Sequence, residues 1–199
     1  MNDLLELAIE AHGGLERWSS VASINAYAVF AWFPALLVDI AGVDRVQAGA
    51  LLALFAVMGL PAALLAPLLA ARMRNVGYLV YASAAFFVAG YLGLLLAPTV
   101  APWLWVTFVG LGPLIFPVTL ALINLRTRTH HTSIALSGFV QSIGYALGAV
   151  GPLVVGLLHD LTRGWTLPLL VLLSTALLAA IGGIVLRKPR FVEDDLKRA

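Results

Sequence analysis

The sequence predicts an all-helical membrane protein with six transmembrane helices, preceded by a short amphipathic N-terminal helix. Hydrophobic residues make up 61% of the 199 positions and charged residues only 11%, and the mean hydropathy of +0.98 lies far above that of soluble domains. The charged residues stand in short clusters, so the apolar stretches have no polar helix face to present to water. Lipid is therefore the expected solvent for most of the chain.

Uncharged stretches of about 20 residues mark the six helices, because this length crosses a bilayer core of about 30 Å. The uncharged stretch 76–125 is too long for one helix, and the turn signal Pro98-Thr99-Val100-Ala101-Pro102 divides it into a hairpin. Within a bundle of residues 21–190, the predicted spans are 21–38, 47–71, 77–97, 102–125, 133–158 and 165–186. The first span is the weakest, because serines and Asn25 dilute its opening.

The two ends of the chain differ in character from the bundle. Residues 1–20 predict an acidic amphipathic helix that Gly13-Gly14 should interrupt, and their acidic residues exclude a secretory signal peptide. Residues 191–199 form a charged tail. Acidic residues also argue against docking of the N-terminal segment on anionic lipid.

The distribution of Lys and Arg predicts the orientation in the membrane, because cytoplasmic loops are enriched in these residues. Ten of the twelve fall on the side that holds both termini, and only Arg45 and Arg163 fall on the other. We therefore expect a multi-pass protein of the cell membrane with both termini in the cytoplasm. The ten are Arg17, Arg72, Arg74, Arg126, Arg128, Arg187, Lys188, Arg190, Lys197 and Arg198, with Arg72 and Arg74 in the first cytoplasmic loop.

Several classes of chemistry have no support in the sequence. No ionisable residue other than tyrosine lies inside a span away from its ends, so no internal proton relay or charged clamp is expected. The absence of cysteine and the scattered histidines give no metal site, and no phosphate loop or nucleophile elbow is present. We expect neither an enzyme nor a cofactor, and the basic residues at span edges do not indicate nucleic-acid binding.

Polar, aromatic and helix-breaking residues in the middle of the spans are the candidates for a solute pathway. A polar stripe on the fifth span consists of Ser137, Gln141, Ser142 and Tyr145, at positions that share one helix face. The pathway candidates are Tyr27, Trp32, Phe116, Gln141 and Tyr145; the packing and hinge candidates are Gly112, Pro113, Pro117, Gly144, Gly148, Gly151 and Pro152.

A structural interpretation of the same residues stays open. Gln141 and the serines of the stripe can simply bridge neighbouring helices, which is common inside membranes. The glycine series on the fifth span is most simply a surface for close helix packing, with Pro152 adding a kink. An interfacial aromatic belt is a weaker alternative for Tyr27 and Trp32, because they lie far from the predicted membrane edge at Asp39.

The order of these features resembles the C-terminal six-helix half of a major facilitator superfamily (MFS) transporter, closest to the cyanate and nitroimidazole transporter branch (CynX/NimT-like). The resemblance covers roughly residues 23–190 and has two departures: the basic loop is reduced to Ala70-Ala71-Arg72-Met73-Arg74, and a first half is absent. The segments that carry it are Tyr27-Ala28-Val29-Phe30-Ala31-Trp32-Phe33-Pro34-Ala35-Leu36-Leu37, Gln47-Ala48-Gly49-Ala50-Leu51-Leu52, Leu111-Gly112-Pro113-Leu114-Ile115-Phe116-Pro117, Ser137-Gly138-Phe139-Val140-Gln141-Ser142-Ile143-Gly144-Tyr145, Gly151-Pro152 and His159-Asp160-Leu161-Thr162-Arg163-Gly164-Trp165.

The resemblance implies a transporter of small polar or anionic solutes, such as cyanate-like or nitroimidazole-like compounds. One bundle would supply one wall of a pathway, so a homodimer or a separate partner half would be required. The alternative is a truncated or fused membrane remnant without transport activity, in which residues 1–20 are foreign to the family.

Overall fold

The computed structural model describes residues 15–73, 75–125 and 127–182, and all regular structure in these ranges is helical. Residues 1–14, which hold most of the predicted N-terminal helix, and residues 183–199 lie outside the described part. The helices are α2 (Leu15–Ala41), α3 (Arg45–Arg72), α4 (Gly77–Leu96), α5 (Pro102–Leu111), the short 3-10 helix η1 (Gly112–Leu114), α6 (Ile115–Leu125), α7 (His130–Thr162) and α8 (Thr166–Gly182).

The helices begin and end at residues that satisfy their free backbone groups. The Asp44 carboxylate accepts a hydrogen bond from the backbone N–H of Gln47 at 2.8 Å and so caps the N-terminus of α3. The Thr129 hydroxyl caps α7 in the same way, and Pro102 opens α5 at a position where its missing N–H costs nothing. Arg163 ends α7 in the left-handed conformation, at φ 52°. As a result, short connections join the long helices.

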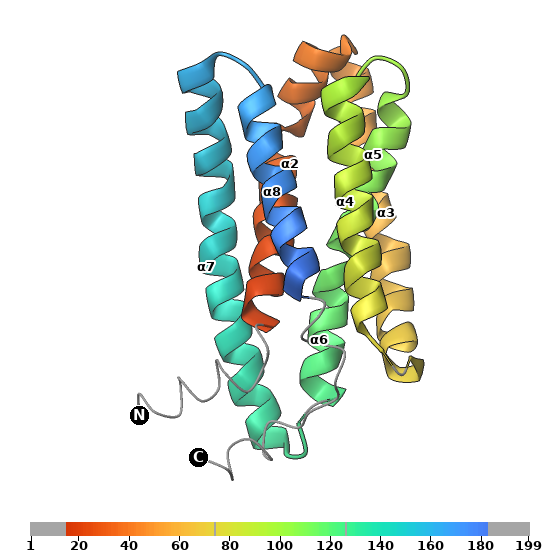
Figure 1. Cartoon of the computed structure of the whole chain (residues 1–199), viewed down its shortest axis with the longest axis vertical. Coiled ribbons are helices and arrows are strands. Elements are labelled where there is room, and N and C mark those ends of the chain that lie inside the picture. The colour runs from red at the N-terminus through yellow and green to blue at the C-terminus, as the bar shows by residue number, and fades with distance from the viewer. Residues whose placement is uncertain (1–14, 74, 126, 183–199) are drawn as a thin grey trace.

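Successive helices run up and down the bundle (Figure 1). The α3–α4 and α6–α7 connections lie at one end, which we call the lower end, as in the figure. The α2–α3, α4–α5 and α7–α8 connections lie at the other, upper end. This arrangement places the helices in the antiparallel order that the predicted spans require.

Five helical stretches are long and apolar enough to cross a membrane, which confirms the helical and membrane-spanning character of the prediction. They are Ser20–Ala41, Arg45–Arg72, Gly77–Leu96, Pro102–Leu125 and His130–Thr162. Helix α8 is apolar but has 17 described residues, and the rest of the predicted sixth span, residues 183–186, lies outside the described part.

The first span differs from the prediction in its start and in its packing. Helix α2 is continuous from Leu15, so residues 15–20 belong to the same helix as the span and not to a separate segment, because no glycine or proline occurs between Gly14 and Pro34. The polar residues that dilute it are buried: Ser20 and Ser23 are each 4% exposed and Asn25 is 0% exposed. Because the bundle encloses these groups, they meet protein and not lipid.

Two groups of buried apolar side chains hold the bundle together. One includes Phe33, Phe55 and Phe87 and joins α2, α3 and α4 with α7 and α8 towards the upper end. The other includes Val80, Leu122 and Val140 and joins α4, α6 and α7 towards the lower end. Among the five membrane-competent stretches, α3 is the least covered, since only 17% of its most apolar part is buried inside the bundle.

Candidate functional site

A cavity of about 700 Å³ lies between α2, α3, α6 and α7. Its walls come from the first half of α2, the second half of α3 and the middle of α7, so it occupies the lower half of the bundle. This volume is in the range of small-molecule sites. The lining residues are Ala22, Ser23, Ala26, Tyr27, Gly59, Ala62, Ala63, Pro67, Pro113, Phe116, Pro117, Leu120, Ala121, Asn124 and Tyr145.

The wall formed by the fourth span is an interrupted helix. The predicted break is present as the 3-10 turn Gly112–Leu114 between α5 and α6, because Pro113 cannot continue the α-helical hydrogen-bond pattern. The Ser83 hydroxyl of α4 donates a hydrogen bond to the Gly112 carbonyl. Gly112 itself is required by close packing, since a Cβ atom there would lie 2.4 Å from the Phe87 ring. Pro113 and Pro117 both line the cavity.

Three of the five predicted pathway residues meet at this cavity. Tyr27 comes from α2, Phe116 from α6 and Tyr145 from α7. The rings of Phe116 and Tyr145 are 6.3 Å apart between centroids with an interplanar angle of 36°. Tyr27 and Tyr145 are 40% and 44% exposed, which leaves their rings accessible from the cavity. These rings offer a surface on which a flat solute can stack.

Gln141 lies outside this cavity, in a shallow neighbouring depression of about 460 Å³. Its side-chain amide donates a hydrogen bond to the Ser137 hydroxyl one turn earlier on α7, at 2.6 Å. Tyr145 lines both the depression and the cavity, so the predicted polar stripe joins the two. Ser137 and Gln141 thus bond to each other at an open depression on α7, while Tyr145 also packs on Phe116 of α6.

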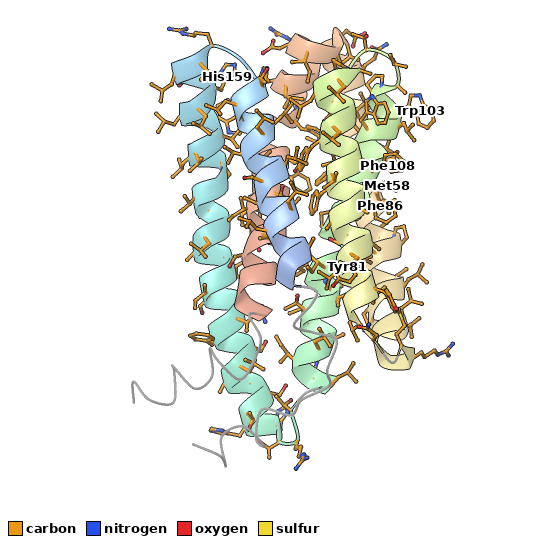
Figure 2. All side chains as sticks on the ribbon, in the orientation of Figure 1. Met58, Tyr81, Phe86, Trp103, Phe108 and His159 are labelled. Carbon is orange, nitrogen blue, oxygen red and sulfur yellow. The ribbon has the colours of Figure 1, made fainter. Side chains whose placement is uncertain are left out.

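Trp32 is placed away from the cavity, at the contact between α2 and the upper part of α7. Its indole N–H donates a hydrogen bond to the Pro152 carbonyl at 2.8 Å, and its ring lies 6.1 Å from the Trp165 ring. His159, which Figure 2 shows at the end of the bundle where α7 leads into α8, packs on Trp165 with centroids 4.2 Å apart. In this structure Trp32 joins helices and does not line the cavity of about 700 Å³.

The predicted glycine face of α7 packs on α2. A Cβ atom at Gly148 would lie 2.7 Å from the Ser23 Cβ, and one at Gly151 would lie 2.7 Å from the Ile24 carbonyl oxygen. Gly156 is equally close to the Trp32 ring, and Gly144 is also buried. Only hydrogen fits at the first two contacts, because their neighbours are a Cβ and a backbone atom that cannot move aside.

The remaining predicted positions lie at the helix ends. Arg72 is the last residue of α3, and Arg74 lies outside the described residues. No group of three or more metal-ligating side chains occurs within the described ranges. Arg72 therefore places a positive charge at the lower end and does not line the cavity.

The structure contains a buried polar cluster around Asn25 that the sequence pattern alone does not predict. The Asn25 amide donates hydrogen bonds to the Val21 carbonyl at 2.8 Å and to the Thr175 hydroxyl at 2.9 Å. The Tyr91 hydroxyl donates to the Asn25 carbonyl oxygen at 2.7 Å. This cluster joins α2, α4 and α8. The sequence signal for this cluster is the presence of Tyr91 and Thr175, two hydrogen-bonding residues, inside predicted spans.

The described residues that line the cavity can bind a solute through hydrogen bonds and apolar contacts, and none of them carries a formal charge. Among the described lining residues, the polar groups are hydroxyls and one amide, from Ser23, Tyr27, Asn124 and Tyr145. Such groups can donate and accept hydrogen bonds, while the aromatic and proline rings supply flat apolar surface. A small, uncharged, planar molecule matches both.

Comparison with known proteins supports a transport-related family. No protein-family model matches the chain, and no solved structure matches it significantly. The chain is 35% identical over 175 residues to the uncharacterised transporter YycB of Bacillus subtilis, an alignment that covers 86% of this chain and 43% of the relative. It is 32% identical over 165 residues to the 2-nitroimidazole transporter of Escherichia coli, covering 82% and 42%.

A third relative is a Thauera aromatica protein provisionally named as an anionic 4-hydroxy-benzoate permease, 38% identical over 105 residues, which are 52% of this chain and 63% of that protein. The chain thus spans less than half the length of the first two relatives. All three carry names of transporters or permeases, and none carries the name of an enzyme. The chain is therefore similar, over 82% of its own length, to less than half of a 2-nitroimidazole transporter, in agreement with the resemblance that its motifs predicted.

Proposed function

We propose that this chain forms one half of an MFS-type secondary transporter for a small planar solute, with the cavity between α2, α3, α6 and α7 as its share of the pathway. The observation that carries the proposal is the aromatic and proline-lined cavity around Tyr27, Phe116 and Tyr145 in a relative of transporters. An interrupted helix beside the cavity supports it, because broken helices often form transporter binding sites.

The cavity favours a neutral solute of the nitroimidazole type over a cyanate-like anion. None of its described lining residues carries a positive charge that could offset the cost of moving an anion into a low-dielectric site. Hydroxyl and amide groups would bind nitro or ring-nitrogen atoms, and Phe116 and Tyr145 would contact the ring faces. The 2-nitroimidazole named for one relative is a molecule of this chemistry.

We further propose that the lower end faces the cytoplasm and that α8 continues as the sixth span of the bundle. Both follow from the excess of Lys and Arg on the predicted cytoplasmic side, with Arg72 and Arg128 at the lower end of the described part and Arg45 and Arg163 at the upper end. The cavity would then open towards the inside of the cell, as one wall of an inward-facing pathway.

A second bundle is required by this proposal, either a second copy of the chain or a separate partner half. The Ser137, Gln141 and Tyr145 stripe lines an open depression, and polar groups of this kind are costly to leave in hydrocarbon. A second bundle placed against α2 and α7 would cover the stripe and close the cavity.

The direct experiment is uptake of 2-nitroimidazole and of cyanate by proteoliposomes that contain the purified full chain, with the oligomeric state measured in the same preparation. We expect saturable uptake of 2-nitroimidazole in a dimeric preparation and none of cyanate. Tyr27→Ala and Tyr145→Ala should each reduce uptake, while Tyr78→Ala, an exposed tyrosine on α4, should not. A stable monomer without uptake would favour the inactive membrane remnant instead.

A further inference from the structure

We infer that Asn25 is a positioning residue for the cavity: held by Tyr91 and Thr175, it fixes the rotation of α2 so that the opposite face of this helix lines the pathway. This inference rests on the proposed function for its effect on solute binding. The claim that Asn25 fixes the rotation of α2 depends only on the hydrogen bonds of Asn25.

The faces of α2 separate these two roles. Ser23 and Tyr27 lie two positions before and after Asn25, and a step of two residues on an α-helix turns by about 200°. Ser23 and Tyr27 line the cavity, whereas Asn25 points away from it towards α4 and α8. A rotation of α2 therefore changes both faces together.

The Asn25 side chain has one arrangement that satisfies all of its groups. Both amide N–H groups donate, one to Val21 of its own helix and one to Thr175 of α8, and the carbonyl oxygen accepts from Tyr91 of α4. The Thr175 hydroxyl in turn donates to the Leu172 carbonyl at 2.7 Å. Asn25 and Tyr91 are both 0% exposed. In a buried apolar environment, a rotated α2 would leave an amide or hydroxyl without a partner, which is costly.

On the opposite face of α2, Ser23 and Tyr27 pack on Gly148 of α7, and Ile24 beside them packs on Gly151. Further up, Trp32 lies about two helix turns after Asn25, and its indole donates a hydrogen bond to the Pro152 carbonyl of α7. Smooth glycine contacts set how closely two helices approach but resist rotation or sliding weakly. The cluster around Asn25 is thus the polar contact on the lower part of α2 that links it to α4 and α8 and so limits which of its residues face the cavity.

The test uses the absence of cysteine in this chain. A single cysteine is placed at Ala26 in the α2 wall of the cavity, and a second, separate variant carries it at Ala63 in the α3 wall. The rate of modification by a water-soluble thiol reagent is then measured with and without Tyr91→Phe. Loss of one hydrogen bond should change the rate at Ala26→Cys roughly fivefold and leave Ala63→Cys unchanged. Tyr78→Phe, which removes a hydroxyl from an exposed tyrosine of α4, is the matched control.

Binding of 2-nitroimidazole to the full chain provides the second measurement. Tyr91→Phe and Thr175→Val should each weaken binding roughly fivefold, and Thr175→Ser, which keeps the hydroxyl, should bind like the unmodified chain. If Tyr91→Phe lowers thermal stability but leaves the Ala26→Cys rate unchanged, Asn25 is merely structural and the inference is wrong. If the unmodified chain does not bind 2-nitroimidazole, the proposed solute fails, while the cysteine experiment still decides the role of Asn25.

Discussion

The Trp165 indole nitrogen donates a hydrogen bond to the Asp39 carboxylate at 2.8 Å. The two residues are 126 positions apart in the sequence, at the end of α2 and at the start of α8. Trp165 is 5% exposed and also packs against Trp32 and His159. This bond therefore ties the first and last described helices together at the upper end, beside the α7–α8 connection.

Removing the Asp39 carboxylate should loosen this upper end. We expect Asp39→Ala to lower the free energy of unfolding by about 1 kcal/mol, because the Trp165 N–H loses its acceptor. Asp39→Asn, which keeps a carbonyl oxygen, should cost less. Thermal unfolding in detergent micelles measures both, with Asp160→Ala as the control because the Asp160 side chain is 81% exposed. An equal loss for Asp160→Ala would mean that the effect arises from charge and not from the hydrogen bond.

Gly151 and Gly138 on α7 provide a matched pair of substitutions. Gly151→Ala should destabilise the protein by about 1 to 3 kcal/mol, because its new methyl group would collide with the backbone of Ile24. Gly138 has open space around the same position, so Gly138→Ala should be neutral or stabilise the helix by up to about 1 kcal/mol. The comparison uses the same unfolding measurement. Similar values for the two variants would show that α2 and α7 are less closely packed than described.

Filling the cavity should block the proposed pathway without unfolding the chain. Ala63 lines the cavity and is exposed, so Ala63→Trp adds a large ring where space is available. Ala56→Trp, on an exposed position of α3 outside the cavity lining, is the control. We expect uptake of 2-nitroimidazole to be lost in the first variant and retained in the second. Retained uptake in both would place the pathway elsewhere.

Single cysteines at the two ends of the bundle test the proposed orientation. His130→Cys at the lower end should react with an impermeant thiol reagent only after the cells are permeabilised, because this end is expected in the cytoplasm. Val100→Cys at the upper end, where Val100 is 77% exposed, should react in intact cells. The reverse pattern would invert the topology.

The spans could be predicted from sequence because lipid leaves little choice for a backbone that must satisfy its own hydrogen bonds. Charges and turn signals gave the start of α3 to within two residues and the end of α4 to within one. The break at Gly112 and Pro113 followed from the chemistry of proline. Helices α2 and α7 are longer than their predicted spans, because the polar residues at their ends interrupt the apolar pattern that predicts a span.

The inner faces of the helices were harder to predict, since they depend on which helices become neighbours. Tyr27, Phe116 and Tyr145 line the same cavity, whereas Trp32, which is equally aromatic, packs against Pro152 instead. For Asn25, in contrast, the sequence pattern predicts only a weakened span and no role in helix packing. A polar residue in a span weakens insertion when it is considered alone, yet with Tyr91 and Thr175 beside it the same residue makes helix contacts specific.

The length of α7 has a consequence for the mouth of the cavity. Its 33 residues extend about 50 Å, while the hydrocarbon core is about 30 Å thick. Tilting alone cannot absorb this mismatch within the usual range of roughly 0 to 40°. Part of α7 must therefore lie outside the hydrocarbon core. We expect this of its first turns, because they hold His130 and His131 and the hydrogen bond from the Ser133 hydroxyl to the Asn124 carbonyl oxygen beside the cavity, and such polar groups favour the layer of phospholipid headgroups. In the proposed transporter, a solute that passes Asn124 would exchange with that hydrated layer before it meets bulk water, so bilayer thickness and headgroup type would control its access.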